Sequence, residues 1–337
     1  AYESLYPVTE CGVKYALTIL RADGTMENYS KQAFVTYISS AYADSNPLVF
    51  SSEEEARAMV EEYKGTLGIN TEAGDIVDEN LSITLQPQTS VVVMDQYTGQ
   101  VKAIVGGRGQ KTTSLSLNRA TDSTRQPGSC FKVLSTYAPG LNECGMTLAT
   151  TIKDEPYRYA SGQQVNNWDG RYIGEARVRY AIEHSMNVCA VRTLTETVGL
   201  EKGYQYLQKF GFTTLVNNDP DYPGMTDVAQ STALGGITRG VYNIEMTAAY
   251  AAIANGGVYT EPILYTEILD HDGNVLIDNT TPDTHEVIKE STAYLLTSAM
   301  EDVISRGTGT SARLSNMAVA GKTGTTENST DLWLSAY

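Results

Sequence analysis

The order of strand-like and helical segments is the feature of this sequence that most restricts its fold. From Gln86 onward, two β-rich runs, SVVVMD and VKAIVGG, flank a turn that contains glycine, which predicts a β-hairpin. Helical patterns dominate residues 131–250, and strand-like patterns return after them. Strands, then helices, then strands predict an α+β domain whose sheet joins segments that are far apart in the chain.

The helices and strands of this domain can be predicted from their patterns and boundaries. Helical runs that end near a glycine are FKVLSTYAPGL, RVRYAIEHSMNVCAVRTLTETVG and NIEMTAAYAAIANGG. The run GVYTEPILYTEILD followed by HDGNVLI predicts a second hairpin, and ESTAYLLTSAMEDVISRG predicts a further helix. The segments MAVAGKTGTT and DLWLSAY predict a last pair of strands.

Residues 1–85 differ from the rest of the chain in their sequence pattern and contain no recognisable catalytic or binding motif. The run GVKYALTIL has apolar residues at helical spacing, and SSEEEARAMVEEYKGTLG begins with a serine cap ahead of acidic residues. We therefore expect a mixed, mostly helical linker or N-terminal region over residues 1–85. A second domain is expected over residues 86–337.

The composition restricts the partners of the protein. Its 337 residues are 41% hydrophobic, which suffices for a substantial core, and they carry a formal net charge of -16. Nucleic acid and anionic lipid bind clustered lysine and arginine, so this charge argues against both partners. No run of about 18 apolar residues is present, so any membrane anchor is expected to lie outside this chain.

The cysteines and histidines show no spacing typical of a metal site. They are Cys11, Cys130, Cys144 and Cys189, and His184, His271 and His285. Four cysteines without a CxxC pair are too few for a disulfide-built scaffold, although one or two disulfides would fit a structural role. We expect structural roles for these side chains, and no metal or cofactor.

Two short motifs combine a serine with a partner side chain. In Ser129-Cys130-Phe131-Lys132, a helix that starts at the serine would place Lys132 one turn later on the same face. A lysine made neutral by burial or by a second cation can remove the proton of a serine. In Ser185-Met186-Asn187, a hydroxyl and an amide at a helix edge could relay a proton and hold a substrate amide. Either motif alone is also typical of an ordinary helix cap or loop.

A third motif, Lys322-Thr323-Gly324, extends to Thr325 on a predicted strand. The edge of such a strand can pair with an extended peptide. Lys322 would supply positive charge, the two threonine hydroxyls would hold a carboxylate, and Gly324 would allow close approach to the backbone. By itself, this motif could equally be a polar turn.

Together and in this order, the three motifs are the signature of penicillin-binding proteins and serine β-lactamases. The resemblance to class A penicillin-binding proteins extends over roughly residues 86–337. It is carried by NRATDSTRQPGSCFKVLSTYAPGL, TALGGITRGVYNIEMTAAYAAIANGGVYTEPI and SRGTGTSARLSNMAVAGKTGTTENSTDLWLSAY. The resemblance implies an antiparallel β-sheet with helices on both faces plus an all-helical subdomain.

The resemblance also implies a D,D-transpeptidase that cross-links peptidoglycan and is covalently bound by β-lactams. Ser129 would attack the D-Ala-D-Ala bond of a stem peptide, and Lys132 would act as general base. Ser185 would pass the proton to the leaving amine, and Asn187 would orient Lys132 and the substrate amide. Lys322 would keep Lys132 neutral by like-charge repulsion.

Further residues have implied or uncertain roles near these motifs. The backbone N–H groups of Ser129 and Thr325 would form the oxyanion hole. Trp168, on a predicted loop upstream of the second motif, could wall the cleft or be buried in the core. Cys130 and Cys189, each close to a motif, are expected to be packing residues.

The resemblance leaves alternatives open. A D,D-carboxypeptidase or β-lactamase-type hydrolase would share the three motifs, and a penicillin-binding sensor domain would keep the fold for binding. Family members act outside the cytoplasm, at the cell envelope, and other cell-wall synthesis proteins are candidate partners. Since the family sheet gains another strand and a helix after the position of Tyr337, we expect the domain to be incomplete at this end.

Overall fold

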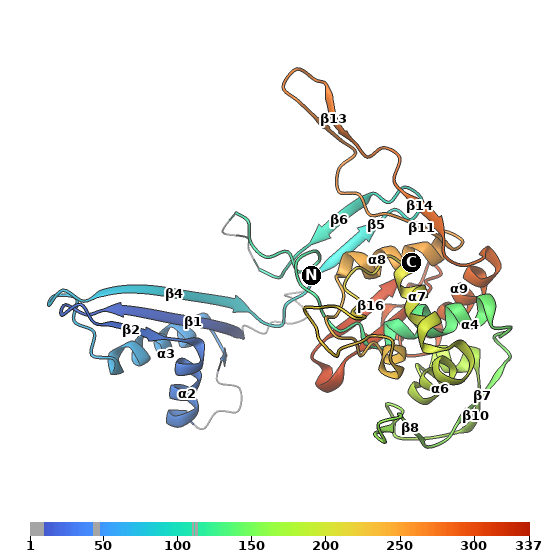
Figure 1. Cartoon of the computed structure of the whole chain (residues 1–337), viewed down its shortest axis with the longest axis horizontal. Helices are drawn as coiled ribbons and strands as arrows, with labels where there is room; N and C mark the ends of the chain where they lie inside the picture. Colours follow the sequence, from blue (N-terminus) through green and yellow to red (C-terminus); the bar gives the residue numbers. More distant parts are fainter. Residues whose placement is uncertain (1–9, 43–47, 110, 112–113) are drawn as a thin grey trace. The chain divides into compact units, whose positions relative to one another are not determined.

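Two units with separate hydrophobic cores make up the chain (Figure 1). The computed structural model describes residues 10–42, 48–109, 111 and 114–337. The first unit comprises the chain up to Thr89 together with Gly107–Ser116, and the second comprises Ser90–Gly106 and Leu117–Tyr337. The three sequence motifs all lie in the second unit.

The first unit is a four-stranded antiparallel sheet packed against two helices. Its elements are β1 (Cys11–Leu20), β2 (Met26–Tyr29), α2 (Lys31–Tyr42), β3 (Val49–Phe50), α3 (Glu53–Thr66) and β4 (Ile76–Leu85). β1 pairs with β4 along its whole length, and with β2 and β3 on its other side. Apolar side chains from β1 meet Phe34 and Ile38 of α2, and Val60 and Tyr63 of α3.

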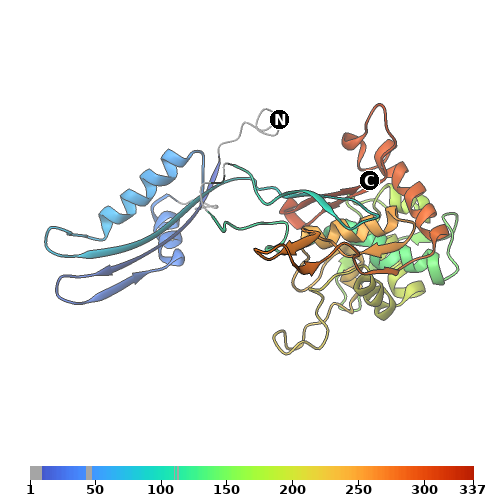
Figure 2. The same ribbon diagram turned by 90° about the horizontal axis from the view of Figure 1, so that it is seen from above.

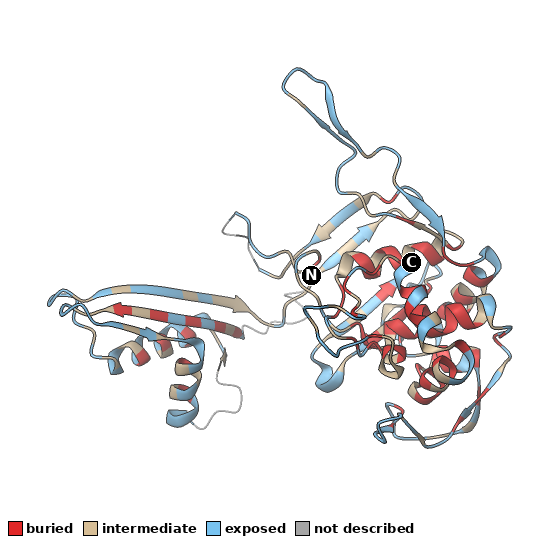
Figure 3. Ribbon diagram, viewed as in Figure 1, coloured by how far each residue is buried: buried red, intermediate tan, exposed pale blue. Residues whose placement is uncertain are grey.

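The prediction of a mostly helical region over residues 1–85 is wrong for the segment GVKYALTIL, which lies in β1. Residues Val13, Tyr15, Leu17 and Ile19 are buried and alternate with more exposed residues, as Figure 3 shows along this strand. A period of two is the pattern of a strand with one covered face, and it outweighs the partial helical spacing of the same segment.

The second helix predicted in this region is confirmed as α3. The side chain of Ser52 accepts a hydrogen bond from the backbone N–H of Glu55, which satisfies a donor at the start of the helix. The acidic side chains of its first turn complement the positive end of the helix dipole.

Helices form most of the buried core of the second unit (Figure 3). They are α4 (Ala138–Glu143), α5 (Val178–Glu183), α6 (Asn187–Thr193), α7 (Leu200–Lys209), α8 (Asn243–Ala254) and α9 (Glu290–Ser305), with π-helical turns at Lys132–Tyr137 and Leu194–Val198. The predicted helical runs are therefore confirmed. The long run around the second motif is interrupted between α5 and α6, where Ser185 has a φ of 54°. A left-handed residue cannot continue a right-handed helix.

Antiparallel strand pairs complete the second unit. They are β5 (Val91–Met94) with β6 (Val101–Val105), β7 (Thr151–Asp154) with β10 (Gly174–Arg177), β8 (Tyr157–Arg158) with β9 (Gln164–Val165), β11 (Val258–Thr260) with β14 (Thr284–Glu286), β12 (Glu267–Leu269) with β13 (Val275–Asp278), and β15 (Gly321–Thr325) with β16 (Leu332–Ala336). The predicted hairpin of β5 and β6 (Figure 2) and the last strand pair are confirmed. The α+β class is confirmed as well.

One predicted hairpin is correct only in part. The segment GVYTEPILYTEILD contains two strands, of which β12 forms the expected hairpin with β13, whereas β11 pairs with β14. The predicted single strand is therefore two strands, β11 and β12, which pair with different partners.

Packing in this unit fixes the segment of the first motif. α8 contacts β5 and β16, and α9 contacts β15. The Tyr250 hydroxyl, from α8, donates a buried hydrogen bond to the backbone oxygen of Cys130, at 2.8 Å. The residue beside Ser129 is therefore anchored to the core. Within the part of the chain that the structure describes, no helix is long and apolar enough to cross a membrane.

Candidate active site

Ser129 lies on a tight turn at the floor of a cleft of about 1370 Å³. The turn is a single 3₁₀ segment, Gly128–Cys130, and the π-helical turn that starts at Lys132 follows it. Gly128 has a φ of 54°, and a Cβ atom there would lie 2.8 Å from the backbone oxygen of Thr325. Glycine therefore lets the serine turn pack directly against the end of β15.

Lys132 is completely buried beneath this cleft. Its Nζ atom donates to the backbone oxygen of Ser185 at 2.5 Å and to Asn187 Oδ1 at 2.6 Å. It also lies 3.1 Å from Ser185 Oγ. The first and second motifs therefore meet through the amine of Lys132.

Backbone contacts position the second motif at the break between α5 and α6. The side-chain oxygen of Asn167 accepts from the backbone N–H groups of Asn187 and Val188, at 2.9 and 3.2 Å. The amide nitrogen of Asn187 donates to the backbone oxygen of Asn166 at 2.8 Å. These bonds turn Asn187 Oδ1 toward Lys132 and leave its side chain on the cleft wall.

Lys322 brings the third motif to the same hydroxyl. It is completely buried on β15, and its Nζ atom donates to Ser185 Oγ and to the backbone oxygen of Thr323, both at 2.9 Å. The Ser185 hydroxyl thus lies between two lysine amines that are 190 positions apart in the sequence.

Burial lowers the pKa values of both lysines, and the charge of Lys322 lowers that of Lys132 further. Loss of hydration lowers the pKa of Lys132 well below the ordinary value, and the charge of Lys322 lowers it further. Loss of hydration also lowers the pKa of Lys322, to about 8. Lys132 bears both effects, so it is the lysine that is more readily made neutral, whereas Lys322 keeps most of its charge near neutral pH. A neutral amine beside hydroxyl groups can accept a proton from one of them.

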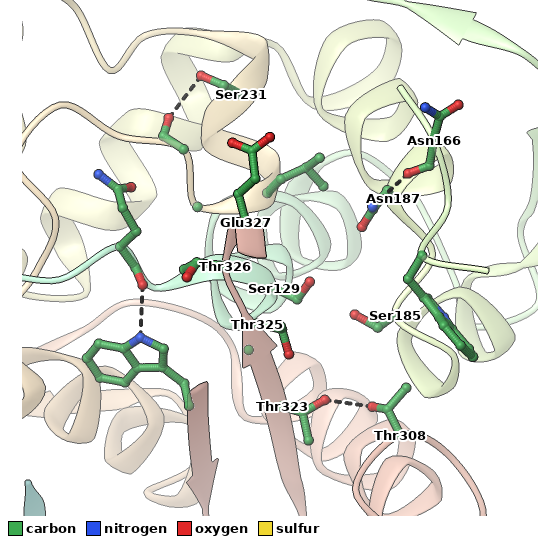
Figure 4. A pocket seen from close by; sticks show the side chains of 18 of the residues that line it. Ser129, Asn166, Ser185, Asn187, Ser231, Thr308, Thr323, Thr325, Thr326 and Glu327 are labelled. Carbon is green, nitrogen blue, oxygen red and sulfur yellow. Dashed lines mark hydrogen bonds between the residues drawn. The ribbon is translucent and has the colours of Figure 1, made fainter. Parts of the chain in front are cut away.

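The remaining motif residues line the cleft along β15. Thr323, Gly324 and Thr325 all face it, and the Thr323 hydroxyl is 2.7 Å from that of Thr308 (Figure 4). A Cβ atom on Gly324 would lie 2.6 Å from the backbone oxygen of Pro127. Close packing therefore requires glycine at this position of the strand.

Trp168 lies on the cleft wall and is not buried in the core. Its side chain is 70% exposed, and its Nε1 atom donates to the backbone oxygen of His184 at 3.1 Å. Of the two alternatives for this residue, the structure supports the cleft wall.

The structure also brings residues to the cleft that the motifs did not indicate. They include Asn166, His184, Arg306, Thr308 and Glu327. His184 had been expected among structural side chains, and it lies on the cleft wall with its ring against Tyr180. No pattern in the sequence links these residues, since the cleft forms from segments that meet only in the tertiary structure.

The cysteines next to the motifs are buried thiols. Cys130 and Cys189 belong to the hydrophobic core, and burial raises the pKa of Cys130 to about 11 and that of Cys189 to about 12. Both thiols are therefore protonated and act in packing, as expected. Among the residues that the structure describes, no group of three or more His, Cys, Asp or Glu side chains could hold a metal ion.

The sequence of this chain is similar to that of known proteins. Residues 89–332 match the family model of the penicillin binding protein transpeptidase domain. Penicillin-binding protein 1A of Clostridium acetobutylicum is 38% identical over 262 residues, which cover 74% of this chain and 31% of that protein. Penicillin-binding protein 1A of Streptococcus pneumoniae is 36% identical over 251 residues, which cover 72% and 33%. The chain thus spans about a third of the length of these curated relatives.

Solved structures share the fold. PonA1 from Mycobacterium tuberculosis in complex with penicillin V has a TM-score of 0.62 and 25% identity, covering 75% of this chain and 68% of that chain. Penicillin-binding protein 1A from Haemophilus influenzae has a TM-score of 0.63 and 24% identity, covering 96% and 51%. The family model covers most of the chain, and the penicillin-binding proteins 1A of Clostridium acetobutylicum and Streptococcus pneumoniae are more than 30% identical to it. The chain therefore belongs to the penicillin-binding protein transpeptidase domain family.

Proposed function

We propose that the second unit is a serine D,D-transpeptidase that cross-links peptidoglycan stem peptides through an acyl-enzyme at Ser129. The observation that carries this proposal is the meeting of Lys132 and Lys322 at Ser185 Oγ, beneath the cleft that Ser129 lines. It supplies a buried neutral base, a proton relay and a fixed cation in one place.

The acylation step follows from this arrangement. Ser129 Oγ bonds to the carbonyl carbon of the penultimate D-Ala, and its proton passes to the neutral amine of Lys132. Two N–H groups of that amine are donated to the Ser185 backbone oxygen and Asn187 Oδ1, so its lone pair is left for a hydroxyl proton. Ser185 then delivers its proton to the nitrogen of the leaving D-Ala as the C–N bond breaks, and Lys132 returns the proton it took to Ser185 Oγ. An amine from a second stem peptide then attacks the ester carbonyl and loses a proton to Lys132, and the C–O bond to Ser129 breaks as Ser129 Oγ takes up that proton.

Backbone groups would stabilise the charge that develops on the carbonyl oxygen. The proposed oxyanion hole consists of the N–H groups of Ser129 and Thr325, which are fixed before the reaction begins. The tight packing of Gly128 on Thr325 supports this assignment, because it holds the serine turn and the end of β15 together.

The stem peptide would bind in extended form along β15. Pairing with the strand orients the peptide, and the hydroxyls of Thr323 and Thr325, with the charge of Lys322, would hold its terminal carboxylate. Gly324 allows the close approach, and Trp168 would cover the opposite side of the cleft. A β-lactam would occupy the same place and acylate Ser129.

The proposal extends to the setting of the reaction. We place this domain outside the cytoplasm, at the cell envelope, attached to the membrane through a segment outside this chain. Peptidoglycan stem peptides and β-lactams are its proposed ligands, and other cell-wall synthesis proteins are proposed partners. We also propose that residues 1–85 form a region distinct from the transpeptidase domain of residues 86–337.

Intact mass spectrometry after incubation with benzylpenicillin tests the nucleophile. One penicillin adduct per chain is expected, mapped to the peptide with Ser129, and Ser129→Ala should show none while its circular dichroism is unchanged. Undiminished labelling of that variant would show that another residue is the nucleophile.

Nitrocefin hydrolysis separates a transpeptidase from a hydrolase. A burst of one equivalent of hydrolysed nitrocefin followed by a stall is expected; sustained turnover would indicate a β-lactamase-type hydrolase.

A further inference from the structure

A single acidic side chain lines the cleft, and it lies at one end. Among the described residues of the lining, Glu327 is the only carboxylate. It follows the end of β15, on the far side of Ser129 and Thr325 from Thr308 and Thr323 (Figure 4). The two ends of the cleft therefore differ in charge, because the buried cation of Lys322 lies near Thr323.

The carboxylate of Glu327 has no countercharge in the described part of the chain. The ion pairs found there do not include it, and its side chain is exposed. Arg125 reaches the same loop, but its Nε atom is paired with Asp331 Oδ1 at 2.5 Å. Glu327 is thus available to a cation on a ligand.

The loop that carries Glu327 is held closed at its base. Thr326 and Asp331 are joined twice: the Thr326 N–H donates to the Asp331 backbone oxygen at 3.1 Å, and the Asp331 N–H donates to Thr326 Oγ1 at 2.8 Å. Within the loop, the backbone oxygen of Glu327 accepts from the backbone and hydroxyl of Thr330. These bonds fix Glu327 relative to β15.

An exposed apolar side chain adjoins this end of the cleft. Leu332 is opposite Thr325 in the β15–β16 register, is 74% exposed and lines the cleft. Directly opposite residues of an antiparallel pair project from the same face. Leu332 and Glu327 together match a ligand side chain with an aliphatic stem and a cationic head, because the stem covers apolar surface while the head meets the carboxylate.

The strand geometry indicates which ligand residue reaches this place. A donor peptide antiparallel to β15, with its carboxylate at Thr323 and its reacting carbonyl near Thr325, runs toward Glu327 in its N-terminal direction. Residues in a strand advance about 3.3 Å each. In this orientation, the residue directly before the reacting D-Ala would lie beside Glu327 and Leu332.

We infer that Glu327 and Leu332 form a specificity subsite for an aliphatic ammonium side chain on the residue that precedes the reacting D-Ala. The inference rests on the proposed function, because it uses the same donor orientation. Donors with a free amine at that position are favoured over donors in which the amine is acylated or replaced by a carboxylate.

Competition with benzylpenicillin acylation tests this subsite. Three peptides are compared: Nα-acetyl-L-Lys-D-Ala-D-Ala, its Nε-acetyl form, and Nα-acetyl-L-Glu-D-Ala-D-Ala. The free lysyl peptide should protect about fivefold better than the Nε-acetyl peptide, and the advantage should shrink at high salt, as for a partly exposed ion pair. Glu327→Gln should reduce the ratio to about one, and Glu327→Lys should make the glutamyl peptide the strongest competitor. Leu332→Ser should weaken both lysyl peptides alike.

Glu267→Gln removes an exposed carboxylate from β12, outside the cleft lining, and serves as the matched control that keeps the preference. Equal protection by the three peptides, or a preference that survives Glu327→Lys, overturns the subsite while leaving the proposed function intact. Absence of any benzylpenicillin adduct overturns the proposed function itself, and the subsite with it.

Discussion

Lys132 and Lys322 share the hydroxyl of Ser185 without any described carboxylate bonded to either amine. Two buried ammonium groups this close repel, so the pair can carry one charge far more easily than two. Lys132 donates to a backbone oxygen and to Asn187 Oδ1, which are neutral acceptors. At the residue scale, only the pKa of Lys132 is lowered by both burial and repulsion, and this difference supports the proposed roles of Lys132 as base and Lys322 as fixed charge.

The pH dependence of acylation should therefore respond to Lys322. The reactive form has neutral Lys132, so the second-order rate constant for benzylpenicillin falls as pH drops through the pKa of this lysine. Burial is the larger cause of that low pKa and Lys322 the smaller. Lys322→Met removes the repulsion, so the pKa of Lys132 rises and the acid limb of the profile moves to higher pH. Quenched-flow acylation over a pH series measures the shift.

A matched variant separates this effect from a general loss of charge. Lys102→Met changes an exposed lysine on β6, and its acid limb should coincide with that of the unaltered protein. An acid limb that stays in place in Lys322→Met would assign the general base to another group.

At the scale of the element, β15 acts through its backbone as much as through its side chains. A Cβ atom on Gly324 would lie 2.6 Å from the Pro127 backbone oxygen and 2.9 Å from Cys130 Sγ. Gly324→Ala should therefore push the strand away from the serine turn and lower the acylation rate constant by about a hundredfold. It should also destabilise the second unit by about 1–3 kcal/mol, as for overpacking of a core. Stopped-flow acylation and thermal unfolding measure the two effects.

Gly65→Ala is the control for this substitution. Gly65 lies in α3, and a Cβ atom there would meet nothing within 4 Å. Alanine favours helix by up to about 1 kcal/mol over glycine, so this variant should be at least as stable and acylate normally. Unimpaired acylation in Gly324→Ala would mean that the close contact of β15 with the serine turn is dispensable.

At the scale of the whole molecule, the chain has two hydrophobic cores with no shared residue. We predict two unfolding transitions in differential scanning calorimetry. Acylation by benzylpenicillin should raise the midpoint of the transition of the second unit alone, because a ligand stabilises the unit that binds it. Ser129→Ala should show no shift. One cooperative transition, or equal shifts of both, would contradict independent stability of the units.

Local patterns determined much of this protein. The motif residues, their order, the capped helix α3, the hairpin of β5 and β6 and the last strand pair were all predictable, since each depends on residues close in sequence. The strand β1 was not predicted, because its apolar residues fit two periods and only burial on one face of the sheet selects the strand. The pairing of β11 with β14 likewise depends on segments that are distant in the chain.

The pKa values of the cleft lysines and the set of residues that line the cleft depend on the tertiary structure alone. The sequence contains Lys132 and Lys322, but complete burial lowers the pKa values of both, and the nearby charge of Lys322 lowers that of Lys132 further. The position of Glu327 at one end of the cleft follows from the closed loop between β15 and β16. Motifs specify which groups are present, whereas charge, hydration and distance depend on long-range packing that no short segment encodes.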